Sequence, residues 1–339
     1  MSEAQIGPLG AGQLSHIGAG LCRPECVVAH GSGLLFTSDW TPPGGVSVIA
    51  PSGRVTRILA TRPGAGIDLP VRPNGIALEP GGSFLLAHLG AERGGIYRLF
   101  PDGRCEVVTD RVGGDPMPPA NFVLLDGAHV WISISTRAVP RALGYRSDQA
   151  TGFLAVHAGG ETRIAADDLG YTNECLIAPD CRTLWVNETF ARRLTAFDLD
   201  GTTLHRRRVV ATFGEGVFAD GMALAADGSL IVTSIVSNRL LRVADGRVTC
   251  LFDDGAPDHV AAVEAAYAAE EMGRPHLDRQ APGRLGHLSS IAFGGAEMRT
   301  AYLGSLLDTR LAFGDIGVAG AVPPWWSYDL GPLAMYEEG

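Results

Sequence analysis

Positive charge is scarce in this sequence. Its 339 residues include 27 Lys plus Arg against 37 Asp plus Glu, for a formal net charge of -10, and charged residues make up only 19% of the chain. Proteins that bind nucleic acids usually carry a basic patch on one face. The scattered basic residues and the acidic balance therefore argue against a nucleic acid as the partner.

Long hydrophobic runs are missing as well. No stretch reaches the roughly 18 to 20 consecutive apolar residues that a membrane-spanning helix needs. Residues 1–5 show neither the basic start nor the apolar segment of a signal peptide. We therefore expect a protein that does not cross a membrane and that resides in the cytoplasm.

Cysteine is sparse, with six residues in the whole chain. Cys22 with Cys26, and Cys175 with Cys181, form two closer pairs, but no His cluster accompanies them. Neither spacing therefore predicts a zinc site or a redox pair. We interpret the cysteines as buried, reduced thiols.

Glycine and proline are abundant, with 45 and 21 residues, which argues against a helical bundle. Short runs of alternating apolar and polar residues recur along the chain and end at Gly-containing turns such as Asp102-Gly103, Asp200-Gly201 and Asp227-Gly228. An Asp-Gly pair between two such runs supplies the positive φ angles of a tight hairpin turn. The sequence therefore predicts an all-β fold.

One phrase repeats six times: a residue with a side-chain oxygen, then an apolar run and, in most copies, a turn. The copies begin at positions 25, 74, 121, 173, 220 and 289, in steps of 49, 47, 52, 47 and 69 residues. A period of about 40 to 50 residues with four strands per unit is typical of β-propeller blades. We therefore expect a single domain over residues 1–339, built as a six-bladed β-propeller.

The long last step contains the strongest helical pattern of the chain. Over residues 258–272, Val260, Val263 and Tyr267 share one face at spacings of three and four. This predicts a helical insertion at about 256–285, before the last blade, which either caps the outside of the propeller or forms a lid over the channel. Residues 323–331 are expected to close the last blade against the N-terminal strand.

The repeated positions must converge on the axis, because the innermost strand of every blade lines the central channel. They share side-chain oxygens and include no Lys or Arg: Glu25, Asn74, Asn121, Asn173, Asp220 and Ser289. Carboxylates that face each other in a partly dry channel are costly unless a cation lies between them. Carboxylate and amide oxygens suit calcium or magnesium better than zinc, so one calcium ion is the first choice.

These motifs resemble the SMP-30/gluconolactonase/LRE-like family of six-bladed propellers and, more loosely, diisopropylfluorophosphatase. The resemblance covers roughly residues 15–330. Its marks are Pro24-Glu25, the repeat at Asn121, Asn173 before the run Thr183-Leu-Trp-Val186, Phe218-Ala-Asp-Gly221 and Ser290-Ile-Ala-Phe-Gly-Gly295. Each motif is short, but together they follow the family's order at blade spacing.

The resemblance implies a divalent metal ion on the axis, held by Glu25, Asn121, Asn173 and Asp220. Family members use calcium, zinc, manganese or magnesium, so the resemblance leaves the ion open. It also implies hydrolysis, most commonly of a lactone, whereas the diisopropylfluorophosphatase branch cleaves phosphorus esters. Both reactions attack an electrophilic centre whose oxygen a metal can polarise.

Two residues are candidates for proton transfer. Asp220 has a second carboxylate oxygen that could accept a proton from the attacking water. His287 lies just before the sixth repeat. It either carries protons or contacts the substrate at the mouth of the central channel, or it is a packing residue.

The sequence departs from the family where sugar lactones are bound. Sugar-lactone hydrolases of the family typically read Arg-x-Asn-Asp in the third repeat, and this chain has Pro119, Ala120, Asn121 and Phe122. Loss of both polar groups argues against a polyhydroxylated substrate. Asn121 and Phe122 are therefore expected to contact a more apolar substrate; three further residues are candidate walls of its pocket or ordinary core aromatics, namely Trp40, His88 and Phe190.

The leading hypothesis is thus a metal-dependent hydrolase, a lactonase, acting on a small and rather apolar lactone. The same metal site could instead support phosphotriester hydrolysis, hydration or a lyase step, because fold and metal do not fix the reaction. A third possibility is a non-catalytic propeller that binds a ligand. In each case the partner is a small molecule, and the oligomeric state stays open.

Overall fold

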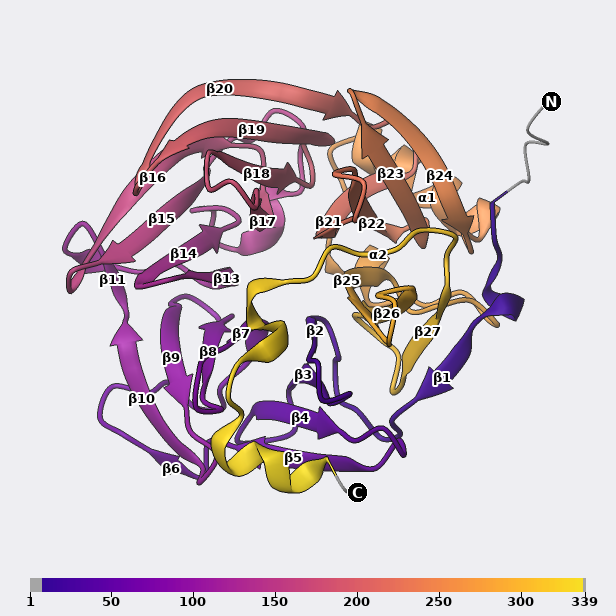
Figure 1. Cartoon of the computed structure of the whole chain (residues 1–339). Helices are drawn as coiled ribbons and strands as arrows, with labels where there is room; N and C mark the ends of the chain where they lie inside the picture. The colour runs from indigo at the N-terminus through magenta and orange to yellow at the C-terminus, as the bar shows by residue number, and fades with distance from the viewer. Residues whose placement is uncertain (1–7, 338–339) are drawn as a thin grey trace.

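Six sheets surround a central axis in the computed structural model, which describes residues 8–337 (Figure 1). In each sheet the strands run antiparallel, from the axis outward. The first three blades contain β2 Val27–Ala29, β3 Leu35–Asp39, β4 Gly45–Ile49 and β5 Val55–Leu59; β7 Pro73–Leu78, β8 Phe84–His88, β9 Gly95–Leu99 and β10 Arg104–Thr109; β13 Ala120–Asp126, β14 His129–Ile134, β15 Gly152–Ala158 and β16 Glu161–Leu169. The predicted six-bladed propeller is confirmed.

The remaining blades follow the same order. They contain β17 Thr172–Ile177, β18 Thr183–Glu188, β19 Arg193–Asp200 and β20 Thr203–Thr212; β21 Val217–Leu224, β22 Leu230–Val236, β23 Arg239–Ala244 and β24 Arg247–Asp253; β25 Leu288–Gly294, β26 Thr300–Ser305 and β27 Leu311–Asp315. Three short additions lie outside this pattern: β6 Arg62–Pro63, which pairs parallel with β10, and the hairpin β11 Arg111–Val112 with β12 Asp115–Pro116.

The sixth blade is closed from the N-terminus. Strand β1 (Ser15–Ile17) pairs antiparallel with β27, Ser15 opposite Phe313. The expectation that residues 323–331 close this blade is therefore wrong. The C-terminal segment instead runs across the centre of the propeller, with 3₁₀ turns at Pro324–Ser327 and Gly331–Tyr336 (Figure 1, yellow).

Apolar layers between adjacent blades hold the ring of sheets together. Trp131 of β14, completely buried, belongs to a cluster with Leu154 of the same blade and Leu184 of the next. Burying a large apolar side chain of this kind contributes about 1.5 to 3 kcal/mol. Because each blade packs only against its neighbours, such contacts fix how the inner strands meet at the axis.

The predicted helical insertion lies between β24 and β25. It comprises α1 Pro257–Ala268 and the short α2 Arg274–Leu277. Val263, on the predicted apolar face, is completely buried in a cluster that contains Phe190 and Phe218. Phe218 stands at the beginning of β21, so the insertion packs on the end of the fifth blade where its innermost strand starts.

Two expectations about single features have different outcomes. All six cysteines are free, and Cys26, Cys105 and Cys175 are buried as predicted, but Cys22 and Cys181 are exposed. The burial prediction is wrong for these two, which lie in loops rather than in inner strands. In residues 8–337, no helix has both the length and the apolarity to span a membrane.

Candidate functional site

The six repeated positions meet in one small polar cavity on the axis. Its walls contain the oxygen-bearing side chains that the repeats align: Glu25, Asn74, Asn121, Asn173, Asp220 and Ser289. Each is at least nine-tenths buried, and each stands just before or in the first half of an innermost strand. The structure thus brings the four expected metal ligands together at one place.

A β-bulge marks this level in five of the six blades. The strand register shifts at Asn74, Asn121, Asn173, Asp220 and Ser289. A bulge adds one residue to a strand and re-aims the side chains around it. The polar ring is therefore built from the same local irregularity repeated around the axis.

Glycine permits the inner strands to approach one another at this level. A Cβ atom on Gly75 would lie 2.8 Å from the Cα of Phe122, and one on Gly221 would lie 2.4 Å from the carbonyl oxygen of Ser289. Both contacts are closer than real Cβ atoms allow. Glycine directly after Asn74 and Asp220 thus lets adjacent blades converge on the cavity.

The amides of the ring form a directional hydrogen-bond chain. Asn74 Nδ2 donates to Asn121 Oδ1 over 3.1 Å, and Asn121 Nδ2 donates to Asn173 Oδ1 over 2.6 Å. Asn173 Nδ2 in turn donates to the hydroxyl of Thr189 over 3.0 Å. Asn74 Oδ1 is buried and has no hydrogen-bond partner among the described residues. These hydrogen bonds fix the orientations of the three amide groups and leave Asn74 Oδ1 free for a hydrogen-bond donor or a cation.

Three carboxyl groups crowd the same part of the channel. Burial raises the pKa of Asp220 well above its usual value, and Glu25 and Glu174 raise it further. Burial also raises the pKa of Glu174 to about 8, although the backbone N–H of Met222 opposes this shift. A cation would relieve such crowding, because an opposite charge nearby favours the ionised carboxylates.

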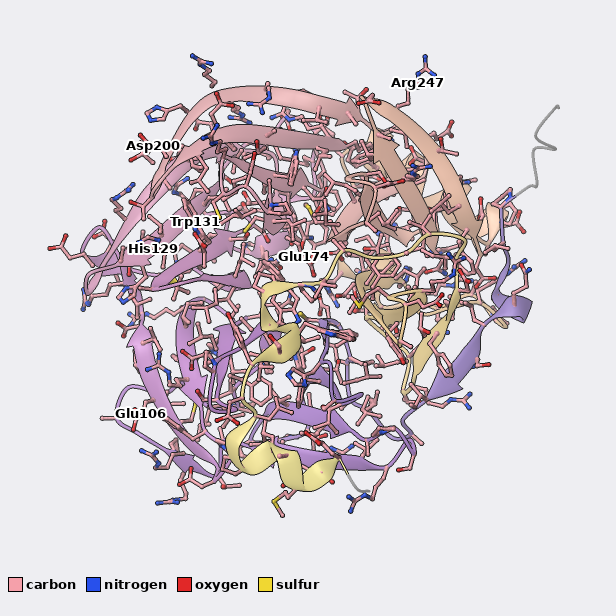
Figure 2. All side chains as sticks on the ribbon, in the orientation of Figure 1. Glu106, His129, Trp131, Glu174, Asp200 and Arg247 are labelled. Atoms are coloured by element: carbon pink, nitrogen blue, oxygen red, sulfur yellow. The ribbon has the colours of Figure 1, made fainter. Side chains whose placement is uncertain are left out.

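Glu174 is a site residue that the sequence reasoning missed. Figure 2 shows it at the centre of the propeller, whereas Glu106, Asp200 and Arg247 lie on the rim. Regular alternation would turn Glu174 away from Asn173, but the bulge between Thr172 and Cys175 leaves both on the lining of the axial cavity. A bulge leaves no signal in the apolar and polar pattern.

Two arginines reach the ring from outside the repeated positions. Arg23 Nε donates to Glu25 Oε2 over 2.7 Å, and both side chains are about nine-tenths buried. Arg141, from a 3₁₀ turn at Arg141–Gly144, donates from Nη2 to Asn121 Oδ1 over 2.7 Å and to the hydroxyl of Ser135 over 2.8 Å. The six ring positions lack Arg, as predicted, but the side chains of Arg23 and Arg141 bring positive charge close to the carboxyl groups.

His287 is held by the backbone on both sides of its ring. Nδ1 accepts from the N–H of Val236 over 2.9 Å, and Nε2 lies 2.9 Å from the carbonyl oxygen of Arg279, to which it donates. Burial lowers the pKa of His287 to about 4. The imidazole is therefore neutral near pH 7, and both of its nitrogens are occupied by hydrogen bonds to the backbone. His287 does not line the axial cavity.

Of the four expected pocket walls, only Phe122 lines the axial cavity. Trp40 donates from its indole N–H to the Pro73 carbonyl over 2.9 Å and stacks on the guanidinium of Arg23.

The other two expected wall residues are buried in packing contacts. His88 stacks on Tyr97 and contacts the Asp68 carboxylate over 3.2 Å. Phe190 lies in an aromatic cluster with Tyr145 and Phe218 under the helical insertion. Their place fits the interpretation as core side chains.

The donor set and the size of the axial cavity fit a single hard cation. Glu25 and Asp220 offer carboxylate oxygens, and the asparagines offer amide oxygens, which calcium and magnesium prefer. The cavity measures about 10 Å³, roughly the room of one water molecule. In the described part of the chain, no group of three or more His, Cys, Asp or Glu is arranged to hold a metal ion, so a cation here would depend on the amides.

A comparison with family models finds one match. Residues 129–257 match the SMP-30/Gluconolactonase/LRE-like region. The resemblance to this family is confirmed. The SMP-30/gluconolactonase match contains Asn173 and Asp220, whereas Glu25 and Asn121 lie before it. No curated protein matches the chain significantly.

Solved structures with a similar fold include a gluconolactonase, a regucalcin and a luciferin-regenerating enzyme. A gluconolactonase from Xanthomonas campestris shares 18% identity over 87% of this chain and 86% of its own, with a TM-score of 0.61. Regucalcin, a calcium-binding protein from Agrobacterium tumefaciens, shares 15% identity over 95% and 99%, with a TM-score of 0.64. A luciferin-regenerating enzyme shares 16% over 91% and 97%, with a TM-score of 0.62. At these identities the likeness is one of fold.

Proposed function

We propose that this protein is a metal-dependent hydrolase that opens a small, rather apolar lactone at the axial ring. The observation that carries this proposal is the convergence of Glu25, Asn121, Asn173 and Asp220 on one buried, ion-sized cavity. The similarity to a gluconolactonase and to the calcium-binding regucalcin supports it. Calcium is the first choice of metal, and zinc, manganese and magnesium are the alternatives to test.

A divalent cation held by these oxygens would polarise the carbonyl of a substrate and stabilise the negative charge that develops there. The residues of the chain then position groups and move protons. The hydrogen bonds from Asn74 to Asn121, and from Asn121 to Asn173, fix the orientation of these amide groups.

Asp220 is the proposed proton acceptor. One of its carboxylate oxygens takes a proton from the attacking water while the water oxygen bonds to the lactone carbonyl carbon. The ring C–O bond then breaks, and the same proton passes to the leaving oxygen. The cation would also favour the ionised form of Asp220 over the protonated form that burial and the neighbouring carboxyl groups favour, so that the carboxylate can accept this proton.

The surroundings of the ring favour an apolar substrate. Phe122 lines the axial cavity and stands where sugar-lactone hydrolases of the family typically have an Asp. Pro119 stands where they typically have an Arg. The hydroxyl groups of a bound sugar would lose their hydrogen bonds to water and would find neither an Asp nor an Arg side chain to replace them. We therefore place alkyl and aromatic lactones before aldonolactones.

A second candidate function is ligand or calcium binding without catalysis. It is favoured by Arg23 and Arg141, which already supply positive charge to the ring. If these guanidinium groups compensate the carboxylates permanently, no reactive cation is needed. This alternative predicts a protein that folds and binds without turnover.

The deciding experiment combines metal analysis with activity. Wild type, Asp220→Asn and the control Asp227→Asn are assayed on aliphatic, aromatic and sugar lactones, with chelator and after addition of calcium, zinc or manganese. Asp227 lies in an exposed turn of the same blade, paired with Arg242, so its replacement tests for nonspecific damage. We expect metal-restored hydrolysis in wild type and Asp227→Asn, and at least a hundredfold loss of kcat/KM in Asp220→Asn.

Other outcomes would contradict the proposal in different ways. Hydrolysis that survives chelation and metal analysis with no bound ion would remove the metal. Turnover of phosphotriesters, hydration or elimination products in place of hydroxy acids would keep the site and change the reaction. Ligand binding without any turnover on the panel would favour the non-catalytic candidate.

A further inference from the structure

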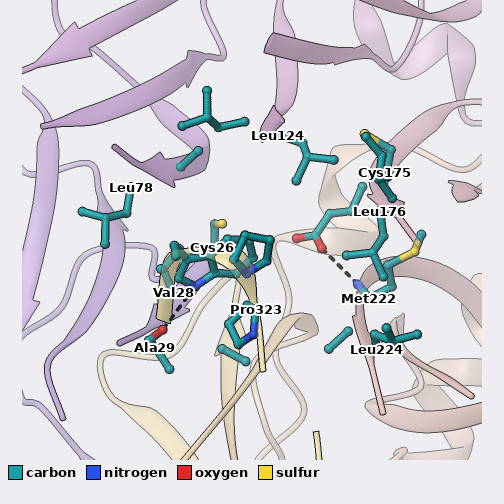
Figure 3. A pocket seen from close by; sticks show the side chains of 18 of the residues that line it. Cys26, Val28, Ala29, Leu78, Leu124, Cys175, Leu176, Met222, Leu224 and Pro323 are labelled. Carbon is teal, nitrogen blue, oxygen red and sulfur yellow. Dashed lines mark hydrogen bonds between the residues drawn. The ribbon is translucent and has the colours of Figure 1, made fainter. Parts of the chain in front are cut away.

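A second, larger cavity occupies the other part of the central channel. It measures about 340 Å³ and is lined by side chains from the innermost strands of all six blades, among them Val28, Leu78, Leu124, Leu176 and Leu224. Figure 3 shows these side chains around the open centre. Since the ring residues lie near the starts of the same strands, this apolar cavity continues the channel beyond the polar ring.

The C-terminal segment forms one wall of this cavity. The indole N–H of Trp325 donates to the carbonyl of Ala29 over 3.2 Å, and the N–H of Gly31 donates to the carbonyl of Trp326 over 2.9 Å. On the opposite side, the N–H of Ala321 donates to the carbonyl of Leu224 over 2.8 Å. The segment is therefore tied to the first and fifth blades and crosses the channel between them, with Trp325 on the cavity wall.

A few polar side chains border the apolar space, namely Asp126, Ser290, Tyr328 and Glu174. Of the two acidic ones, Asp126 is half-buried and Glu174 is buried. Glu174 is 92% buried and lines this cavity as well as the polar ring. Its Oε2 accepts from the N–H of Met222 over 2.9 Å, whereas Oε1 has no hydrogen-bond partner among the described residues. A carboxyl oxygen left without a partner in an apolar space is costly.

We propose that this cavity is a second ligand site, which takes a small apolar molecule carrying one hydroxyl group that bonds to Glu174 Oε1. Its volume lies within the 300 to 1,000 Å³ that is usual for small-molecule sites. Water fits such a space poorly, because a buried water needs two to four polar partners.

The chemical class follows from the charge of the site. A hydroxyl both donates and accepts, so it pairs with Glu174 in either protonation state of the carboxyl. A ligand carboxylate would instead add a negative charge near Glu25, whose charge already acts on Glu174, and like charges repel. The site is therefore specific for alcohols over acids of the same shape, and it does not depend on the proposed function of the ring.

Binding of 4-phenylbutan-1-ol to the full chain tests this inference. Isothermal titration calorimetry is run in the presence of chelator, with butylbenzene and 4-phenylbutanoate as comparison probes. Tryptophan emission is followed in parallel, with Trp325→Phe to identify the reporting side chain. We expect saturable binding of the alcohol, an emission change that disappears in Trp325→Phe, and an affinity about fivefold above that of the hydrocarbon, as one neutral hydrogen bond provides.

Variants locate the binding. Leu176→Trp and Leu224→Trp fill the cavity from two different blades, so that a folding failure of one leaves the other. Val209→Trp adds the same side chain on an exposed outer strand as the control. We expect the affinity for the alcohol to be at least tenfold weaker in both filling variants and unchanged in Val209→Trp. Glu174→Leu should lose the preference for the alcohol over butylbenzene.

The proposal is overturned if wild type shows no saturable binding of the alcohol, or if the folded filling variants bind it as tightly as wild type does. Equal affinities for the alcohol and for 4-phenylbutanoate would refute the assigned chemical class. Because chelator is present throughout, a missing metal or a missing lactonase activity affects none of these results.

Discussion

Arg141 and Asn121 are joined directly at the axis: the guanidinium Nη2 lies 2.7 Å from the amide Oδ1 and donates to it. The Nε atom of Arg141 is buried and has no hydrogen-bond partner among the described residues. The amide oxygen that Arg141 uses is one that a cation would also need. Arginine and metal are therefore competitors at Asn121.

Replacing Arg141 by Met should strengthen calcium binding. The variant removes one of the two donors to Asn121 Oδ1, leaving the Asn74 amide, and takes a positive charge away from the ring, so we expect roughly a tenfold tighter calcium affinity, the equivalent of about 1.4 kcal/mol. Calorimetric titration of the chelator-treated protein measures it. Arg137→Met, in the same loop but paired with the partly exposed Asp167, is the control and should leave the affinity unchanged. A weaker affinity in Arg141→Met would mean that the arginine orients the amide for the metal.

The buried carboxylate of Glu188 should be essential to the fourth blade. Its side chain is completely buried, yet its pKa is lowered: burial opposes ionisation, but hydrogen bonds from Arg193 and from the Gly170 N–H outweigh it. Its partners Arg193 and Arg207 are about a third exposed, so water compensates their charges in part when the carboxylate is removed. The lost hydrogen bonds to a charged group correspond to about 1.5 to 3 kcal/mol.

We therefore expect Glu188→Gln to lower the free energy of unfolding by about that amount in a denaturant titration. Asp102→Asn, which breaks an exposed pair with Arg104, is the matched control and should leave it almost unchanged. Similar values for the two variants would show that burial adds nothing to the pair.

The sequence predicts the ring because it predicts the repeats. Glu25 and Asn121 are 96 residues apart, but a fixed blade period places them at equivalent starts of inner strands, and propeller closure then brings them to the axis. The apolar periodicity around Val263 likewise predicts α1, since helical spacing is a local property.

The remaining site residues are set by features without a local signal. Glu174 reaches the channel through a bulge, which the alternation of β17 does not encode. Arg141 comes from a long loop between β14 and β15, and no repeat fixes where such a loop ends. The C-terminal segment covers the channel because β1 already closes the last blade, and strand-like composition cannot distinguish these two destinations.

Gly221→Ala should disrupt the axis. The new Cβ would lie 2.4 Å from the carbonyl oxygen of Ser289 and 2.8 Å from the Cα of Ser290, so two inner strands must separate. Overpacking of this kind costs about 1 to 3 kcal/mol. Thermal unfolding measures the loss, and Gly214→Ala, with open space around its Cβ, should change stability by less than about 1 kcal/mol. Equal unfolding temperatures for both variants would contradict the close approach of the strands.

His287 should make the protein sensitive to acid. Its pKa is lowered to about 4 in the folded protein by burial, against about 6.5 when unfolded. Between these values the unfolded state binds the proton and the folded state does not, so stability falls as pH decreases from 6.5 to 4 and this contribution then levels off. The full difference corresponds to about 3 kcal/mol.

Denaturant titrations of wild type and His287→Gln across pH 3 to 8 isolate this contribution as the difference between the two curves. We expect the variant to lose stability at neutral pH, because the bonds to Val236 and Arg279 are weakened, and to show the shallower decline in acid. The exposed His205, changed to Gln, should leave the curve parallel to that of wild type. If His287→Gln keeps the acid-induced decline of wild type, another group causes it. If instead the folded variant loses all turnover while its stability profile stays that of wild type, His287 acts in the chemistry rather than in the fold.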